Sequence, residues 1–437
     1  MKKRLYKILS FLLINTVLFS SICAYAFTPD NRIANNEYTL VVEGFDWGPA
    51  VNKVIIGMDA PASAVDFKDF SVSVERSHNC AEIPAAQVKG SRSVVYAYVS
   101  DGQGKRVKEG GFVTLVLAVA PNMPLGSPFQ YSQKAGCRGN QWVDYKVSVT
   151  NTKTNQVWNK EKNRLMPLVD EFDLTGKYEY EAGKTMSYAA FTPGNKSNKT
   201  PLIIWLHGGG EGGTDPTIPL IGNKAFNYAS ADIQSYFGAA YVLVPQCPGA
   251  WMHNKEGVMQ SGSGEDVYNK GLMALIKEYV TKHPDIDGKR IYVGGCSNGG
   301  YMALKLILKE PDYFAAGYIS ALAYQSQYIS DQQMTGIKHV PIWFVHSKDD
   351  ATTIPDQTVV PVYQRLKAAG AKNVHFSYYD HVIDLSGFFG GENYHFPGHW
   401  SWVYSHVNHA KTDFDGSPVK LNGKPVTIME WMAAQSK

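Results

Sequence analysis

One serine lies in a pattern that can turn a hydroxyl group into a nucleophile. Residues 295–300 read Gly-Cys-Ser-Asn-Gly-Gly and fit the motif G-x-S-x-G, in which a strand turns sharply into a helix. Glycines are needed in such a turn because side chains beside the serine have no room. An apolar strand pattern at 290–293 precedes the motif, and a helical pattern at 301–306 follows it. This context predicts that Ser297 is a nucleophile.

A nucleophilic serine needs a histidine as its base and a carboxylate that orients the histidine. In a strand–turn–helix site of this kind both partners follow the serine, the acid first. The apolar strand predicted at 341–345 ends just before Asp349 and Asp350, and we prefer Asp350 as the acid. The alternative is that both carboxylates only cap the next turn. For the base we prefer His399, which precedes a predicted helix, over His395.

A glycine-rich segment supplies the fourth part of such a site. The apolar strand predicted at 202–206 runs into His207-Gly-Gly-Gly-Glu-Gly-Gly213. Glycines let backbone N–H groups approach an oxyanion that develops during the reaction. We expect one donor to be the N–H of Asn298 and the other that of Gly209 or Gly210. A phosphate-binding loop is excluded because the pattern G-x-x-x-x-G-K-[ST] is missing there.

The elements that must position these residues change in character near residue 165. Residues 27–165 contain short, alternating, β-rich segments, which predict an all-β sandwich. The segments are Tyr38–Val42, Val51–Ile56, Phe70–Val74, Val94–Val99, Phe112–Val119 and Tyr145–Val149. We interpret Lys160–Leu168 as a charged connector.

Residues 166–437 alternate fully apolar strands with helices. This pattern predicts a mostly parallel sheet flanked by helices, with ligands bound at the carboxyl ends of the strands. The expected strands are Leu202–Leu206, Tyr241–Val244, Ile291–Val293, Ile342–Val345 and Val374–Tyr379, and the expected helices are Val267–Val280, Tyr301–Leu308 and Val359–Ala368.

The start of the chain predicts a secretory signal. Four basic residues within the first seven precede an apolar run at 8–22 and the small-x-small pattern Ala24-Tyr25-Ala26. The alternative, a membrane anchor, is disfavoured because polar residues interrupt the run, which is short for a span. We therefore expect cleavage near Ala26, no membrane span afterwards, and a secreted or periplasmic protein. The formal charge of +3 then becomes −1, which gives no electrostatic reason to expect a nucleic-acid partner.

Four cysteines follow the predicted signal, an even number that suits disulfides in an oxidising compartment. Cys80 and Cys137 lie in the same half of the chain, so we expect them to pair. For Cys247 and Cys296, a second disulfide and two buried free thiols remain equally open.

Together these features resemble the secreted bacterial carboxylesterases that carry an immunoglobulin-like (Ig-like) domain ahead of an α/β-hydrolase domain, which implies that the predicted sandwich is Ig-like. That group is related to feruloyl-esterase-like, polyhydroxybutyrate-depolymerase-like and prolyl-oligopeptidase-like hydrolases. The similarity rests on Gly44–Val54, Trp205–Gly213, Pro245–Pro248 with Trp251, the turn at Ser297, and Gly398–Tyr404. It implies a catalytic triad of Ser297, Asp350 and His399. It also implies that the first domain helps assembly into a homo-oligomer or shapes the mouth of the active site.

The sequence thus predicts a serine ester hydrolase without a metal or organic cofactor, since no H-E-x-x-H or Cys-x-x-Cys pattern occurs. The expected substrates are short-chain or aromatic acyl esters or a polyester. Trp251, Trp400 and Trp402 follow predicted strands and would suit an aromatic acyl group or a flat polymer surface, although simple packing explains them equally well. One alternative is a serine peptidase of the prolyl-oligopeptidase type, but about 140 β-rich residues are too few for a propeller. A second is a non-catalytic surface or carbohydrate-binding protein, which the complete set of site residues disfavours.

Overall fold

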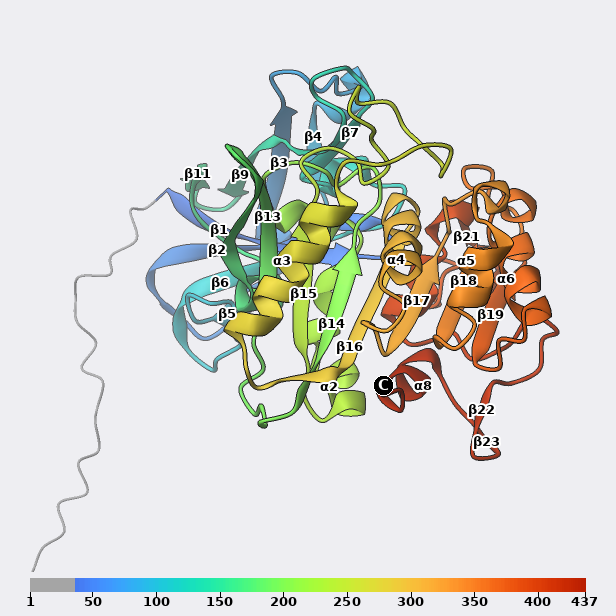
Figure 1. Ribbon diagram of the computed structural model, residues 1–437. Helices are drawn as coiled ribbons and strands as arrows, with labels where there is room; N and C mark the ends of the chain where they lie inside the picture. The colour runs from blue at the N-terminus through green and yellow to red at the C-terminus, as the bar shows by residue number, and fades with distance from the viewer. Residues whose placement is uncertain (1–35) are drawn as a thin grey trace, which may run out of the picture. The chain divides into compact units, whose positions relative to one another are not determined.

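The structure is a computed structural model and describes residues 36–437. The predicted signal peptide and its cleavage site near Ala26 lie outside the described residues. The first part of the described chain forms two facing β-sheets (Figure 1), with the strand orders β11-β1-β2-β6-β5 and β10-β9-β3-β4. The strands are β1 Glu37–Phe45, β2 Gly48–Ala62, β3 Phe70–Ser77, β4 Lys89–Arg92, β5 Val94–Ser100, β6 Gly110–Leu117, β9 Asp144–Asn151, β10 Val157–Trp158 and β11 Lys160–Leu165. A hairpin of β7 (Phe129–Ser132) and β8 (Gly139–Trp142) stands apart from both sheets.

The two sheets form a sandwich because alternate side chains of each strand point to one face. In β3, Phe70, Val72 and Val74 are buried, whereas the residues between them are more exposed. Val147 and Val149 of β9 add to the same layer, and apolar side chains of β1, β2 and β6 close it from the other sheet. The predicted strands of this part of the chain are all present.

The segment 160–168 is a correction to the sequence analysis. It was expected to be a connector, but Lys160–Leu165 forms strand β11, which pairs in parallel with β1 at the edge of its sheet. Its side chains are mostly exposed and charged, and Lys160 Nζ lies 2.8 Å from a carboxylate oxygen of Glu37. Charged residues are common on edge strands because they discourage further pairing, and they hide the strand from a search for apolar alternation.

The second part of the chain is built on an eight-stranded sheet with the order β12-β13-β15-β14-β16-β17-β18-β19. Its strands are β12 Asp173–Glu181, β13 Lys184–Phe191, β14 Thr200–Leu206, β15 Tyr241–Gln246, β16 Ile286–Cys296, β17 Ala316–Ser320, β18 Ile342–Ser347 and β19 Val374–Tyr379. The six strands from β15 to β19 in this order are parallel, and β12 and β13 add an antiparallel edge. The carboxyl ends of the parallel strands therefore lie along one edge, as predicted.

Helices cover both faces of this sheet, and α3 and α4 lie in front of it in Figure 1. The helices are α1 Thr217–Gly222, α2 Ala231–Phe237, α3 Asn269–Lys282, α4 Asn298–Lys309, α5 Asp331–Gly336, α6 Val359–Ala368, α7 Trp402–His406 and α8 Ile428–Ala433. Along β14, Leu202, Ile204 and Leu206 face the layer that contains α3 to α6. Ile203 and Trp205 face the opposite layer, which is continuous with the core of the sandwich. The sandwich and the helix-covered sheet thus share one hydrophobic core.

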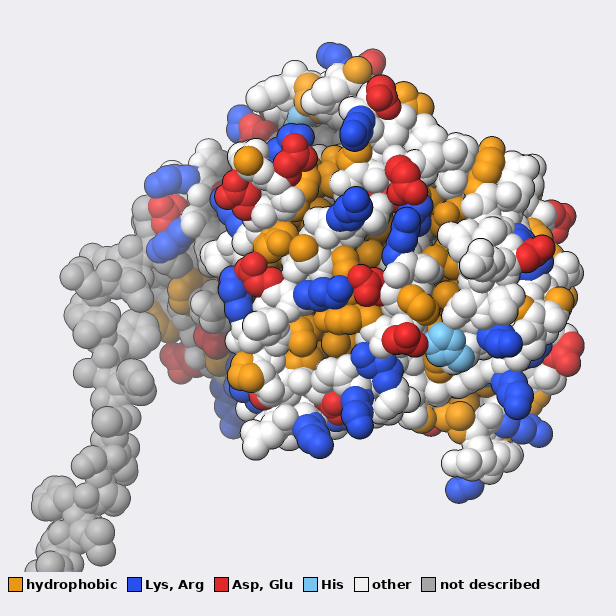
Figure 2. Space-filling model, in the orientation of Figure 1, with side chains coloured by type: hydrophobic (Ala, Val, Ile, Leu, Met, Phe, Trp, Pro, Cys, Tyr) orange, Lys and Arg blue, Asp and Glu red, His pale blue; other side chains and the backbone are white. Residues whose placement is uncertain are grey.

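The cysteines of residues 36–437 form one disulfide and leave two free thiols. Cys80 and Cys137 are joined by a disulfide, whereas Cys247 and Cys296 are buried free thiols, the second of the two arrangements left open for them. On the face that carries α3, basic and acidic side chains are interspersed (Figure 2). Within residues 36–437, no helix has the length and apolar character needed to cross a membrane.

Candidate active site

Ser297 occupies the turn between β16 and α4, with φ 53° and ψ −115°. A positive φ is costly for a residue with a side chain and persists only where the surroundings enforce it. Here the Ser297 N–H donates to the carbonyl of Ser320 on the next strand, and its own carbonyl accepts from Tyr301 N–H in the first turn of α4. The strand–turn–helix predicted from the motif is therefore present, with Ser297 at its apex.

Gly299 explains why the motif needs glycine two residues after the serine. A Cβ atom at this position would lie 1.9 Å from the carbonyl oxygen of Leu206 and 2.5 Å from that of His207. Both are backbone atoms of β14 and the loop after it, so they cannot move aside as a flexible side chain would. The absence of a side chain at Gly299 lets α4 begin directly against the glycine-rich loop.

We expect Gly299→Ala to lower the free energy of unfolding by about 3 kcal/mol or more, because the added methyl group must displace backbone. Urea denaturation followed by tryptophan fluorescence measures this change. Gly288→Ala is the matched control, because it also lies in the β16–α4 unit and a Cβ there meets nothing within 4 Å. Equal stability of the two variants would contradict the close approach.

His399 and Asp350 meet at the carboxyl edge of the sheet. His399 lies in a short 3-10 helix, Gly398–Trp400, just before α7, and its Nδ1 is 2.9 Å from Asp350 Oδ2 and 3.1 Å from Oδ1. A carboxylate only accepts hydrogen bonds, so Nδ1 carries the hydrogen and Nε2 is left with a free lone pair. This is the tautomer that a general base requires.

Asp350 is held by more than the histidine. Its Oδ1 accepts from the N–H groups of Thr352 and Thr353, and its Oδ2 accepts from the Thr353 hydroxyl at 2.7 Å. His346 Nε2, on β18, lies 3.0 Å from the same Oδ2. Burial alone would raise the pKa of the Asp350 carboxyl, but the hydrogen bonds from His346 and His399 outweigh it and hold that pKa well below its ordinary value. The carboxylate thus stays charged although it is buried.

In the glycine-rich loop after β14, a backbone carbonyl group is hydrogen-bonded to a neighbouring side chain. His207 Nδ1 lies 2.6 Å from the Gly208 carbonyl oxygen and its Nε2 accepts from Cys247 N–H, so the ring is neutral and hydrogen-bonded at both nitrogens. Burial lowers the pKa of His207 to about 4, which keeps it neutral. Within residues 36–437, nothing accepts a hydrogen bond from the N–H groups of Gly209, Gly210 or Asn298. Three unpaired donors therefore lie beside the serine.

A cavity of about 810 Å³ brings these groups together. Ser297, Asn298, Gly209, Gly210 and His399 all line it. Within the described residues no hydrogen bond joins Ser297 Oγ to His399 Nε2, but such bonds are commonly loose in unliganded sites. The arrangement places a hydroxyl, a base oriented by a buried acid and N–H donors around one space, which is what acyl transfer needs.

The structure separates the predicted tryptophans. Trp400 and Trp402 line the cavity, but Trp251 does not: it is fully buried and packs against the rings of His207 and Tyr268. The expectation that Trp251 contacts the substrate is therefore wrong, because its side chain turns into the core.

The rejected candidates are engaged elsewhere. Asp349 lies 2.8 Å from His381 Nδ1, and His395 stacks on the same ring with a bond to the Glu392 carbonyl. Neither Asp349 nor His395 lines the cavity.

Part of the cavity wall comes from the sandwich, which sequence reasoning did not resolve to residues. Trp47, Tyr131, Arg138 and Asn140 line the cavity together with the site residues. His346 was missed as well, although its position four residues before Asp350 on the same strand end is a signal that could have been used. For the sandwich residues no such local signal exists.

Comparison with known proteins agrees with this fold. The sheet and its helices form an α/β-hydrolase fold with an all-β sandwich ahead of it, which confirms the predicted fold class. Residues 37–162 match the family of the esterase Ig-like N-terminal domain, and residues 189–386 match the phospholipase/carboxylesterase family. The chain thus combines the Ig-like domain of esterases with a carboxylesterase-type hydrolase domain, which confirms the resemblance read from its motifs.

Two curated relatives cover parts of the chain. Feruloyl esterase B of Neurospora crassa is 30% identical over 127 residues, which are 29% of this chain and 40% of that protein. Poly(3-hydroxybutyrate) depolymerase of Ralstonia pickettii is 25% identical over 171 residues, 38% of this chain and 32% of that protein. The chain therefore spans less than half of either relative. A crystal structure of a thermostable esterase covers 92% of this chain and 99% of its own at 22% identity, with a TM-score of 0.70, which shows a shared fold.

Proposed function

We propose that this protein is a serine esterase that hydrolyses carboxylic esters through an acyl-enzyme. His399 takes the proton of Ser297, whose Oγ attacks the ester carbonyl, and Asp350 stabilises the charged imidazole. The oxyanion is bound by the N–H groups of Asn298 and of Gly209 or Gly210, and the alcohol leaves with the proton held by His399. Water then attacks the acyl-enzyme with the same histidine as base. The bond between His399 and the buried Asp350, beside the cavity that Ser297 also lines, is the observation that carries the proposal.

The cavity supports small or aromatic acyl groups as substrates. Trp47, Trp400 and Trp402 line it, and flat rings of this kind suit an aromatic acid or the repeating units of a polyester. The partial relatives act, by their names, on feruloyl esters and on poly(3-hydroxybutyrate), two substrates of these two types. We infer a substrate with a short or aromatic acyl group.

An extracytoplasmic location is part of the proposal. The disulfide between Cys80 and Cys137 requires an oxidising compartment to persist, and the predicted signal at residues 1–26 would deliver the protein there.

The peptidase alternative gains nothing specific from the structure. The two sheets at 37–165 have the strand orders of a sandwich rather than of propeller blades, and no other feature of the cavity favours an amide over an ester. The two chemistries share a triad, so only the choice of substrate separates them.

The test uses purified protein with p-nitrophenyl esters from acetate to dodecanoate, and chromogenic peptide anilides in parallel. We expect hydrolysis of the shorter esters and much slower or no cleavage of the anilides. A fluorophosphonate probe should also label one peptide, the one that contains Ser297, as found by mass spectrometry. Preferential anilide cleavage would establish the peptidase instead, and labelling elsewhere would refute Ser297 as the nucleophile.

A further inference from the structure

The hairpin of β7 and β8, which belongs to the sandwich part of the chain, touches the glycine-rich loop directly. The N–H of Asn140 donates to the carbonyl of Gly210 at 2.7 Å, and its side-chain Nδ2 donates to Glu211 Oε1 at 2.9 Å. The preceding Gly139 has φ 97°, and a Cβ there would lie 2.5 Å from the Gly210 oxygen. The backbone of strand β8 therefore packs directly against the backbone of the loop, and one residue, Asn140, forms two hydrogen bonds to it.

Glu211 is a buried residue of this loop, and it lies at the wall of the cavity. It is 5% exposed, and within the described residues it forms no ion pair with a lysine, arginine or histidine. Burial raises its pKa to about 7, whereas the bond from Asn140 opposes that rise. The Glu211 carbonyl in turn accepts from Gln246 Nε2 on β15 at 3.0 Å. Asn140 and Gln246 thus both bond to Glu211, one from each part of the chain.

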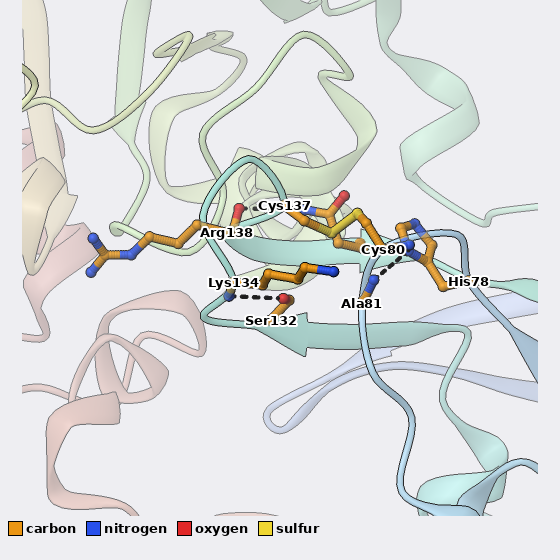
Figure 3. The surroundings of a disulfide bond; sticks show 8 residues. His78, Cys80, Ala81, Ser132, Lys134, Cys137 and Arg138 are labelled. Atoms are coloured by element: carbon orange, nitrogen blue, oxygen red, sulfur yellow. Dashed lines mark hydrogen bonds between the residues drawn. A yellow bond between two sulfur atoms is a disulfide. The ribbon is translucent and has the colours of Figure 1, made fainter.

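The hairpin that carries Asn140 is itself fastened. Cys137, in the turn between β7 and β8, is disulfide-bonded to Cys80, which follows β3 in the sandwich (Figure 3). Figure 3 also shows Arg138 directed away from the disulfide, while the Lys134 N–H bonds to the Ser132 hydroxyl across the turn. A covalent link three residues before Asn140 restricts the movement of the hairpin relative to the sandwich.

We propose that Asn140 is a positioning residue for the oxyanion hole, and that the disulfide-bonded hairpin is its support. This inference rests on the proposed function. The backbone N–H of Asn140 holds the carbonyl of Gly210 and its side chain holds Glu211, so Asn140 restrains the loop directly after the N–H groups of Gly209 and Gly210 and thereby limits the directions that these groups can take. Such donors act only when they point at the place where the oxyanion forms. A small displacement of the donors therefore reduces the stabilisation of the transition state more than it reduces the binding of the substrate.

A purely structural role predicts a different outcome. If Asn140 only joined the two parts of the chain, its loss would lower stability and leave the turnover of the folded enzyme unchanged. Trp142 provides the matched control: it lies two residues further along β8, and its Nε1 donates to Thr217 Oγ1 at 2.9 Å, which also joins the two parts but does not touch the loop. Trp142→Phe removes that bond and keeps an aromatic ring.

The test measures kcat and KM on a p-nitrophenyl ester that the unaltered enzyme hydrolyses. Asn140→Ala removes the side-chain bond to Glu211 and keeps the backbone N–H that bonds the Gly210 carbonyl. We expect this variant to lower kcat by about 10- to 100-fold with KM nearly unchanged, and Trp142→Phe to keep kcat. In a double-mutant cycle, Glu211→Ala should add little to Asn140→Ala, because the two residues act through one contact. The double variant Cys80→Ser/Cys137→Ser should lower kcat in the unaltered background but not in the Asn140→Ala background.

Hydrogen exchange gives a readout that needs no catalysis. The amides of the loop at 208–213 should exchange faster in Asn140→Ala than in the unaltered protein or in Trp142→Phe. Unchanged kcat and unchanged exchange in Asn140→Ala would overturn the inference while leaving the esterase proposal intact. If the unaltered protein hydrolyses no ester, the esterase proposal fails, and the exchange rates alone decide whether Asn140 holds the loop.

Discussion

Ser297→Ala is expected to lower kcat for ester hydrolysis by about 10⁴- to 10⁶-fold, with KM changed little. The loss is large because the hydroxyl forms the covalent intermediate, and no other group can replace it. The residual rate would come from the oxyanion donors and from substrate binding alone. Steady-state kinetics on the preferred p-nitrophenyl ester, with active-site titration of the unaltered enzyme, measures the effect.

The fold should survive this substitution, so the loss can be attributed to chemistry. Serine and alanine both carry a Cβ atom, and therefore the strained backbone at φ 53° costs both residues about the same. Within residues 36–437 the Ser297 hydroxyl has no hydrogen-bond partner that would be left unsatisfied. The urea midpoint should match that of the unaltered protein. A variant that keeps a tenth or more of the original kcat would sink the assignment of Ser297.

The positions of Ser297, Asp350 and His399 could be predicted because each depends on local geometry. The glycines on either side of Ser297 indicate the sharp turn. Asp350 and His399 follow the ends of strands, and a parallel sheet brings these ends together at one edge. Short-range rules of this kind need no knowledge of which distant segments meet. The structure places all three at that edge, in the order the sequence suggested.

Two kinds of feature escaped sequence reasoning for physical reasons. The direction of a side chain after a strand depends on packing, so Trp251 could not be distinguished from Trp400 by position alone, and it packs on His207 instead of lining the cavity. Contacts between distant segments are the second kind. Asn140 and Glu211 are 71 residues apart, the first on strand β8 of the hairpin and the second in the loop after β14. No motif marks Asn140, because its importance comes only from where the sandwich places it.

Asp350→Asn provides the second large effect, with an expected fall in kcat of about 10⁴-fold. The amide nitrogen of asparagine would face His399 Nδ1 and favour the tautomer in which Nε2, not Nδ1, carries the hydrogen, so that His399 can no longer accept the serine proton. Asp349→Asn is the matched control, because that neighbour bonds His381 outside the cavity and should keep nearly full kcat. If Asp349→Asn were the variant that lost activity, the acid would have to be reassigned.

The same variant should change the response of stability to acid. Hydrogen bonds hold the pKa of Asp350 below its ordinary value of 3.8, so ionised Asp350 stabilises the folded state above about pH 4, and this contribution disappears as the pH falls into the acid range. Asparagine does not titrate, and Asp350→Asn should therefore lose less stability than the unaltered protein between neutral and acid pH. Urea midpoints measured across that range, with Asp349→Asn in parallel, test this expectation. A steeper acid loss in Asp350→Asn would mean that the buried carboxyl is not ionised in the folded enzyme, and its role as the partner of the charged histidine would fail with it.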